Sequence, residues 1–256
     1  MTSSWFFAAF PWIGGAAAVV LAVLLFATNS LRTGQASSRW RDPRWLSWMA
    51  VVAYLLHNVE EYGLDLRGQT NAFPDVLCAN FGLPPYPNCP IPPQFFLAVN
   101  IPLFWVVGPL VALLGARHSL MGFALYSVIS INALAHLAAV VTTGQPYNPG
   151  LLTALILFIP LTACVGYNGF RDNRLTPGTM VLLPACGVIL HMILAGSLAM
   201  FLKGWINAEA VVWSQIVNAA LLVLIVWLAE RRRGGAVPCP ARNRRSGVRD
   251  CKRGSA

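Results

Sequence analysis

The residues best suited to chemistry in this chain gather in one short apolar stretch. Residues 54–62 hold His57, Glu60 and Glu61, although the whole chain has only four histidines. Side chains three and four residues apart share one face of a helix, so His57 would lie beside both carboxylates. The apolar run around them begins at Trp45 and is typical of a membrane span, where charged groups are rare and mark functional sites. A helix end in the membrane interface, with solvated glutamates, is the structural alternative.

Two later apolar segments hold further histidines at a similar depth. Asn132 and His136 lie one helical turn apart on the same face, and His191 lies within a run of aliphatic residues. Counted from the expected cytoplasmic ends of the spans, these residues and His57 agree in depth within roughly 10 Å, at about 1.5 Å rise per residue. We therefore expect their polar faces to meet in one bundle. Each histidine alone could instead be a hydrogen-bonded packing residue, and His118 falls in a tight loop away from this layer.

Imidazole and carboxylate groups at one depth suit a divalent metal ion. Both zinc and iron accept these ligands, so we expect one of the two ions at the site. Water activated by such an ion, with a glutamate as base, would make a hydrolytic centre. The expected catalytic residues are His57, Glu60, Glu61 and His136, and the expected metal ligands are the same four residues together with His191.

Three further polar residues are candidates for contacting a substrate. They are Asn132, Asn100 in the third apolar segment, and Tyr147 just before the fifth. Asn100, like Asn218 in the last segment, could equally bond between helices, where such a bond contributes only about 1 kcal/mol.

The composition indicates a membrane protein. The chain has 256 residues, of which 57% are hydrophobic and 11% charged, whereas about a quarter of the residues in a soluble domain are charged. We expect an all-α, polytopic transmembrane helix bundle over residues 1–230, with about seven spans of the length that a bilayer requires. The expected spans are 5–27, 45–64, 94–115, 119–141, 149–167, 177–201 and 208–229.

The net charge of +9 is better explained by the topology of a membrane protein than by nucleic-acid binding. If the N-terminus lies outside and the C-terminus in the cytoplasm, only Arg67 and Lys203 of the 18 basic residues fall outside, as the positive-inside rule predicts. The first span is expected to be retained, because its arginines follow it and none precedes it. The inner residues would be Arg32, Arg39, Arg41, Arg44, Arg117, Arg171, Arg174 and the basic residues of 231–253.

The segment 231–256 mixes arginine with glycine, proline and serine and has few apolar residues. We expect this tail to be disordered and to lie near anionic lipid headgroups. No nucleic-acid partner is expected, since basic residues next to a membrane span are routine.

The one long outer loop, 65–93, is rich in proline and asparagine, so we expect little regular structure in it. It contains Cys78 and Cys89, which could form a disulfide on an oxidising face of the membrane; two free thiols are the alternative. Cys164 and Cys186 fall inside spans and are expected to be apolar packing residues.

The stretch His57-Asn58-Val59-Glu60-Glu61 resembles the motif that names the HXXEE family of multi-pass, mostly bacterial membrane proteins. The resemblance takes in Asn132 to His136 and the Tyr-x-Pro-Gly stretch from Tyr147 to Gly150, and extends over about 45–201. It implies a shared site at His57, Glu60, Glu61 and His136, but it does not indicate which activity that site has.

The order of the glutamate pair, His136 and His191 is also similar to the plan of the CAAX-protease-like intramembrane glutamate proteases. Asp65 stands here where that family has arginine, and Asn132 where it has phenylalanine. We therefore treat this likeness as an analogy.

Two classes of function follow from these residues. The first is an enzyme in the cell membrane acting on a lipid or other apolar substrate, either as a metal-dependent hydrolase or as an acid/base isomerase. The second is a proton- or ion-coupled transporter, because glutamate and histidine at membrane depth also relay protons. No inverted repeat supports the transporter. A haem- or quinone-linked subunit using the histidines as axial ligands is a third reading, which the two carboxylates disfavour.

Overall fold

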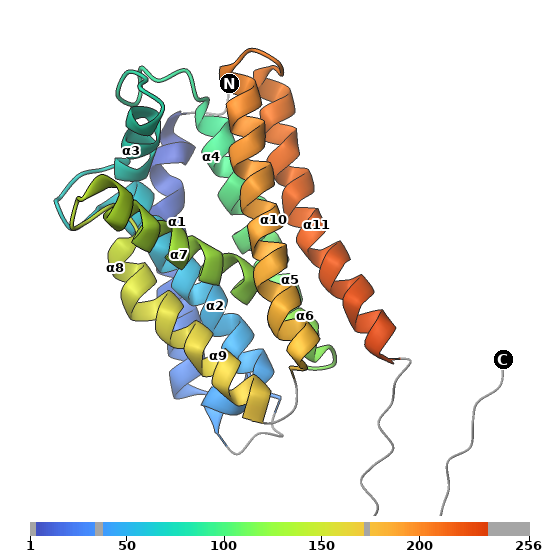
Figure 1. Cartoon of the computed structure of the whole chain (residues 1–256). Coiled ribbons are helices and arrows are strands. Elements are labelled where there is room, and N and C mark those ends of the chain that lie inside the picture. The colour runs from blue at the N-terminus through green and yellow to red at the C-terminus, as the bar shows by residue number, and fades with distance from the viewer. Residues whose placement is uncertain (1–3, 34–37, 172–174, 235–256) are drawn as a thin grey trace, which may run out of the picture.

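The computed structural model describes residues 4–33, 38–171 and 175–234, and this part of the chain is a bundle of helices without a strand (Figure 1). The all-α prediction is confirmed. The helical segments are α1 (Ser4–Ala27), η1 (Arg39–Arg41), α2 (Pro43–Asn58), η2 (Val59–Gly63), α3 (Ala72–Asn80), α4 (Pro93–Asn100), η3 (Ile101–Val107), α5 (Gly108–Leu114), α6 (Ser119–Gly122), α7 (Ala124–Thr143), α8 (Leu151–Thr153), η4 (Ala154–Phe158), α9 (Ile159–Arg171), α10 (Pro177–Leu202) and α11 (Ala208–Gly234).

Six helices of the described chain are long and apolar enough to cross a membrane, which makes this a multi-pass membrane protein. Each corresponds to one of the predicted spans. They are Trp5–Ala27, Pro93–Leu114, Ser119–Thr143, Leu151–Arg171, Pro177–Leu202 and Ala208–Arg232.

The remaining predicted span, 45–64, coincides with α2 and η2, which are not among these six. It differs in its surroundings: every residue of α2 except Arg44 and Leu56 is buried. Helix α2 packs against α1, α5, α7 and α9, so its polar residues face protein, not lipid. Such an interior helix need not be uniformly apolar.

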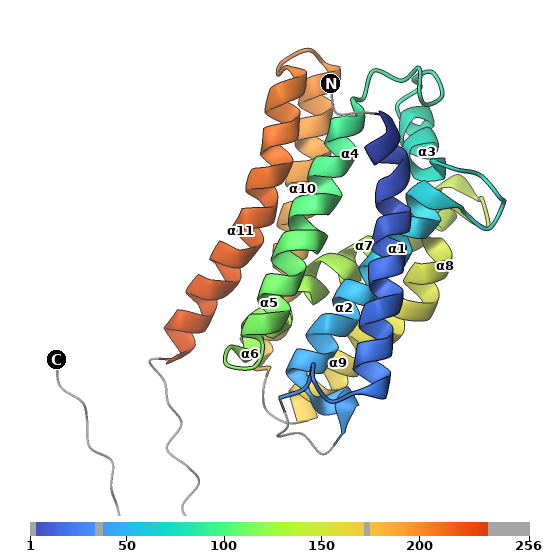
Figure 2. The same cartoon turned by 180° about the vertical axis from the view of Figure 1, so that it is seen from behind.

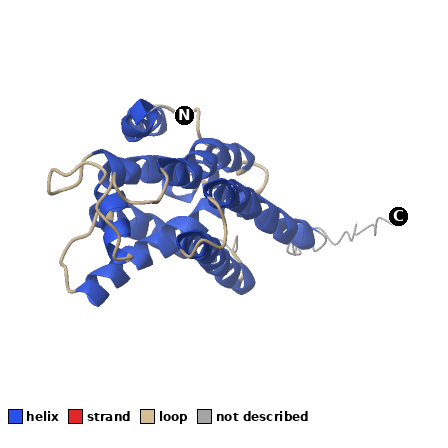
Figure 3. Cartoon of the chain, turned by 90° about the horizontal axis from the view of Figure 1, so that it is seen from above, coloured by secondary structure: helices blue, strands red, loops and turns tan. Residues whose placement is uncertain are grey.

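Successive long helices run in alternating directions, and α7 lies obliquely across the bundle (Figures 1 and 2). Helix α1 begins at the end of the bundle opposite to the end where α11 finishes. Seen from above, the N-terminal helix lies at the edge of the bundle (Figure 3). This arrangement agrees with seven passes; which end faces the cytoplasm stays a prediction. Arg174 and residues 235–256, on which part of that prediction and the predicted tail depend, lie outside the described residues.

A buried carboxylate determines where α2 begins. Asp42 Oδ1 accepts hydrogen bonds from the backbone N–H groups of Arg44 and Trp45 at 3.0 and 3.2 Å, and Pro43 occupies the first helical position. Asp42 Oδ2 accepts from the backbone N–H and the hydroxyl of Thr33 at 2.8 and 2.9 Å. The start of α2 fixes the rotation of the helix, and hence the direction in which His57 points.

Three segments with π-helical hydrogen bonding, η2, η3 and η4, interrupt the helices near the centre of the protein. The π-helical turn is rare and is found frequently at functional sites. Segment η2 carries Glu60 and Glu61, η3 follows Asn100, and η4 follows Thr153. All three therefore adjoin the polar residues described below.

The outer loop contains a helix that we did not predict, α3. Its Phe73 and Leu77 pack into a cluster of buried side chains that includes Tyr62, and this burial stabilises a segment whose composition favours turns. A disulfide joins Cys78 at the end of α3 to Cys89. The free cysteines of the described chain are Cys164, half-buried, and Cys186, buried.

Candidate metal centre

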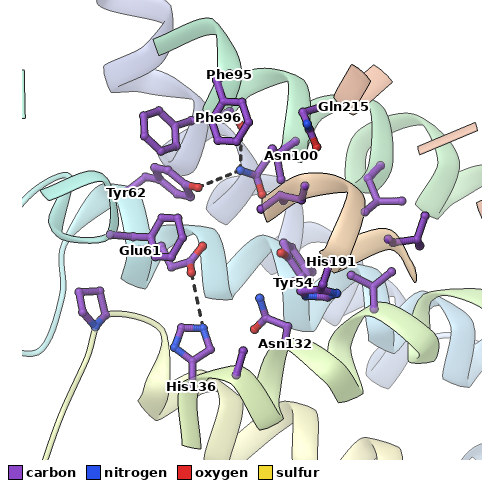
Figure 4. Close-up of a pocket in the computed structure, with 18 of the residues that line it drawn as sticks. Tyr54, Glu61, Tyr62, Phe95, Phe96, Asn100, Asn132, His136, His191 and Gln215 are labelled. Atoms are coloured by element: carbon purple, nitrogen blue, oxygen red, sulfur yellow. Dashed lines mark hydrogen bonds and ion pairs between the residues drawn. The ribbon is translucent and has the colours of Figure 1, made fainter. Parts of the chain in front are cut away.

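The carboxylate of Glu61 lies between two histidine rings from different helices. Its Oε1 atom is 3.2 Å from Nε2 of His57 in α2 and 3.6 Å from Nε2 of His136 in α7. All three side chains are buried. Figure 4 shows Glu61 and His136 pointing toward each other at one side of a cavity. One ligand atom from each of the three residues lies within 4.8 Å of the other two, so a single ion could be shared.

The ring of His57 is held in one orientation by Thr153. The hydroxyl of Thr153 is 2.6 Å from Glu60 Oε2 and 3.1 Å from the carbonyl oxygen of Gly150, and both of these oxygens accept. Nδ1 of His57, 2.8 Å from the same hydroxyl oxygen, must therefore be the donor. The lone pair of neutral His57 is then on Nε2, which is directed at Glu61.

His136 is held in the same way by Asn148. Nδ2 of Asn148 donates to the backbone carbonyl of His136 at 3.0 Å, which identifies the other end of the amide as the oxygen. That oxygen, Oδ1, lies 2.5 Å from Nδ1 of His136 and accepts its hydrogen. The lone pair of neutral His136 is therefore also on Nε2.

Two imidazole lone pairs and a carboxylate oxygen converge in this arrangement, and such a group could hold a metal ion. Nε2 of His57 is buried and, apart from its contact with Glu61 Oε1, has no hydrogen-bond partner within the described chain. Two ligands of one tetrahedral zinc, each bound at about 2.0–2.2 Å, lie about 3.3–3.6 Å apart. The distances of 3.2 and 3.6 Å from Glu61 Oε1 to the two nitrogens fit that spacing. Hydrogen bonds from the second nitrogen of each ring are the usual support of metal-binding histidines.

Glu60 lies outside this group of three and accepts four hydrogen bonds. The donors are the backbone N–H groups of Leu152 and Thr153 at 3.0 and 2.8 Å, the Thr153 hydroxyl, and the Tyr147 hydroxyl at 3.0 Å. The two N–H groups belong to the first turn after Gly150, where unpaired donors favour an anion. Glu60 thus ties α2 to the start of α8 and, through Thr153, positions His57.

Gly150 allows the two histidine rings to approach the backbone. A Cβ atom at this position would lie 2.5 Å from Cε1 of His57 and 2.6 Å from Cε1 of His136. The residue also has a φ of +94°, which favours glycine. The Tyr-x-Pro-Gly stretch therefore contributes three contacts to the centre: Tyr147 to Glu60, Asn148 to His136, and Gly150 to both rings.

Tyr147 joins the outer loop to this centre. Its hydroxyl accepts from the backbone N–H of Leu66 at 3.2 Å while donating to Glu60, and the guanidinium of Arg67 lies 5.2 Å from its ring centre. Burial and the nearby Glu60 carboxylate raise the pKa of the Tyr147 phenol, so it remains a donor at physiological pH.

A cavity of about 210 Å³ adjoins Glu61 and His136. Its walls are largely apolar, and it is bordered by α2, η2, α3, α4, α7, α10 and α11. The polar side chains in its lining are Glu61, Tyr62, Asn80, Asn100, Asn132, His136, Asn148, His191, Gln215 and Asn218, together with Tyr54.

The structure separates the predicted site residues into three groups. His57, Glu61 and His136 meet, as described. His191, Asn100 and Asn132 line the cavity, and Nδ1 of His191 is bonded to the carbonyl of Gly187 at 2.8 Å. Glu60 and Tyr147 bind each other beside the centre, and Tyr147 is not among the cavity-lining residues.

Sequence reasoning missed Thr153, Asn148 and Gln215. Thr153 lies three residues after Gly150 and Asn148 within the Tyr-x-Pro-Gly stretch, so the resemblance pointed close to both. Gln215 lies three residues before Asn218, on the same face of α11, and this spacing was the available signal.

A comparison with protein families identifies this part of the chain. Residues 48–165 match a family model described as "Protein of unknown function with HXXEE motif". Over this segment, which is less than half of the chain, the sequence is similar to the HXXEE family. The HXXEE segment contains every residue of the centre, from His57 to Thr153, and ends before α10, earlier than the 201 that we expected. No curated protein and no solved structure matches the chain.

Proposed function

We propose that this protein is a metal-dependent enzyme of the membrane, which hydrolyses a lipid or similar amphiphile bound in the cavity. The observation that carries the proposal is the convergence of His57 Nε2, His136 Nε2 and Glu61 Oε1, with both rings fixed by hydrogen bonds at Nδ1. Two histidines and one carboxylate are the protein ligands of several hydrolytic zinc sites, and also of some iron oxygenases. Because the proposed reaction is a hydrolysis, we expect the ion to be zinc and not iron.

The position of the centre suits catalysis. A divalent ion bound there would polarise a substrate carbonyl or activate water. Glu61 and His136 border the cavity, so an ion that they hold would adjoin the space where a substrate binds. His57 does not line the cavity and would serve only to hold the ion.

His191 is the candidate general base. Its Nδ1 donates to the carbonyl of Gly187, since a carbonyl oxygen only accepts, and this leaves the lone pair on Nε2. The residue lines the same cavity as Glu61 and His136. A base in this place could take a proton from the attacking water and pass it to the leaving group.

Access from the membrane is supported by the exposure of the lining. Ala135 of α7 lines the cavity and is exposed, and Ala139, one turn later, is half-buried. Helix α7 lies within the candidate span Ser119–Thr143. A substrate dissolved in the bilayer could therefore reach the centre without crossing water.

The test compares the lipids of cells that express the wild type, Glu61→Gln or the control Glu209→Gln, whose glutamate lies at the exposed start of α11. We expect the wild type and the control to consume a lipid that Glu61→Gln leaves intact. In ¹⁸O-labelled water the product should contain one labelled oxygen.

Identical lipids in all three strains would overturn the proposal. A product without the label would also overturn it and would favour the isomerase. Proton uptake into proteoliposomes that Glu61→Gln abolishes would favour the transporter instead.

A further inference from the structure

Four amide oxygens in the cavity lining have no hydrogen-bond partner in the described part of the chain. They belong to Asn100 on α4, to Asn132 on α7, and to Gln215 and Asn218 on α11. Asn100 and Gln215 are 1% and 2% exposed, so neither is supplied with bulk water. Burying an unpaired acceptor is costly, which makes four of them around one cavity unusual.

The amide orientations of Asn100, Gln215 and Asn218 are each fixed by a backbone carbonyl. Nδ2 of Asn100 donates to Phe96 O at 2.9 Å, and Nδ2 of Asn218 to Leu190 O at 2.9 Å. Nε2 of Gln215 donates to Ser197 Oγ at 2.7 Å and to Val211 O at 3.5 Å. Because a carbonyl can only accept, the amide nitrogen must face it, and the unpaired atom in each side chain is the oxygen.

One donor is also available beside these acceptors. The hydroxyl of Tyr62 accepts from Nδ2 of Asn100 at 3.1 Å, and it donates no hydrogen bond to any described residue. Figure 4 shows Asn100, with Tyr62 and Gln215 on either side, away from His136. The cavity thus offers several acceptors and one donor at a distance from the metal centre.

The charge of the lining restricts the ligand further. Among the described residues, no lysine or arginine lines the cavity, and Glu61 is the single carboxylate there, already facing two histidines. An anionic headgroup would meet amide oxygens and no cation. An ammonium group could donate to those oxygens, but it could not accept from Tyr62. A hydroxyl group both donates and accepts.

We infer that the substrate is an uncharged amphiphile whose hydroxyl group lies among Asn100, Gln215 and Asn218, donates to one of their amide oxygens and accepts from Tyr62, while its apolar chain follows the walls of the cavity. The volume of about 210 Å³ is below the range of roughly 300–1,000 Å³ of sites that enclose a whole drug-sized ligand. The cavity therefore holds the polar end and the adjoining carbons, and the rest of the chain extends into the membrane. This inference rests on the proposed function, since it names the substrate class of the same site.

Equilibrium binding of radiolabelled dodecan-1-ol to the full chain in nanodiscs, with empty nanodiscs as background, tests the inference. This probe has no bond for a hydrolase to break, so binding is measured without turnover. We expect saturable binding that unlabelled dodecan-1-ol displaces, and at least tenfold weaker displacement by dodecane, dodecanoate and dodecylamine. Equal displacement by dodecane would overturn a hydroxyl site, and stronger displacement by dodecanoate or dodecylamine would overturn an uncharged ligand.

Asn218→Leu and Asn168→Leu form a matched pair of variants. Each asparagine is half-buried and donates from Nδ2 to a backbone carbonyl of another segment, Leu190 O for Asn218 and Trp40 O for Asn168, but only Asn218 lines the cavity. We expect Asn218→Leu to weaken dodecan-1-ol binding about tenfold and Asn168→Leu to leave it unchanged. Equal effects of the two variants would overturn the assignment.

The metal content of the same samples separates this inference from the proposed function. Metal-loaded protein that does not bind the alcohol would contradict the substrate class alone. Metal-free protein that binds the alcohol, with the loss in Asn218→Leu, would contradict the proposed metal chemistry and support the hydroxyl site.

Discussion

At the scale of single residues, the centre is organised by hydrogen bonds that determine which nitrogen of each histidine is free. Thr153 and Asn148 each accept from Nδ1 of one ring, and both Nε2 atoms face Glu61. His57, Glu61 and His136 could be predicted from residue type and helical spacing. Their supporting residues could not, because a threonine or an asparagine has no distinctive pattern until its partner is known.

Replacing Thr153 by valine tests the support of His57. The variant keeps the shape of the side chain but removes the acceptor for His57 Nδ1 and one of the four donors to Glu60. We expect the affinity for zinc, measured by competition with a chromogenic chelator, to fall about 10- to 100-fold. Thr162→Val is the control, since the Thr162 hydroxyl has no partner among the described residues. Unchanged affinity in Thr153→Val would contradict this role.

Gly150→Ala tests the close approach of the rings to the backbone. The added Cβ would overlap Cε1 of both His57 and His136, and the left-handed backbone adds a cost of about 1–2 kcal/mol. Gly144→Ala is the matched control, because Gly144 has a φ of +68° and open space around it. We expect both variants to lower the thermal midpoint, but only Gly150→Ala to abolish high-affinity metal binding. Equal metal binding in the two variants would show that the close approach of the histidine rings to the backbone is not needed for metal binding.

At the scale of elements, the helices were predictable from apolar segments, and the details that position the site were not. Helical spacing predicts that Glu60 and Glu61 both face His57, whereas in the π-helical segment η2 Glu61 faces His57 and Glu60 faces α8. Helix α3 was missed because its sequence favours turns and its stability comes from burial against Tyr62. In both cases a tertiary contact decides between local structures that the sequence alone leaves open.

The start of α2 gives a prediction at this scale. Asp42→Ala removes the acceptor for Arg44 N and Trp45 N and for Thr33 as well. We expect the free energy of unfolding to fall by about 1–2 kcal/mol, measured by denaturant unfolding in detergent. Asp42→Asn should lower the free energy of unfolding by less than Asp42→Ala does, because asparagine is as good a helix cap as aspartate. A larger loss in Asp42→Asn would indicate that charge, not capping, is what Asp42 contributes.

At the scale of the whole molecule, composition and the distribution of basic residues predicted a multi-pass helical membrane protein. They could not predict that α2 is buried by the other helices, because burial depends on how the helices pack. This central place for α2 brings the HXXEE motif beside α7 and α8, which carry or follow the other residues of the centre.

The orientation in the membrane is testable with reporter fusions. Alkaline phosphatase, which is active only outside the cytoplasm, should be inactive when fused after Gly234 and active when inserted between Gly204 and Ile206, in the turn between α10 and α11. The reverse pattern would show that the bundle is inverted and that the centre lies nearer the cytoplasmic face.

The metal content of the purified protein tests the central claim most directly. The wild type, reconstituted with zinc or iron and freed of excess, should retain about one ion per chain. His57→Ala, Glu61→Gln and His136→Ala should each retain less than about a tenth of that, because three ligands are needed for a stable site. His118→Ala, whose histidine faces Glu230 away from the cavity, should retain the wild-type amount. A metal-free wild type, or full occupancy in the three variants, would contradict the account.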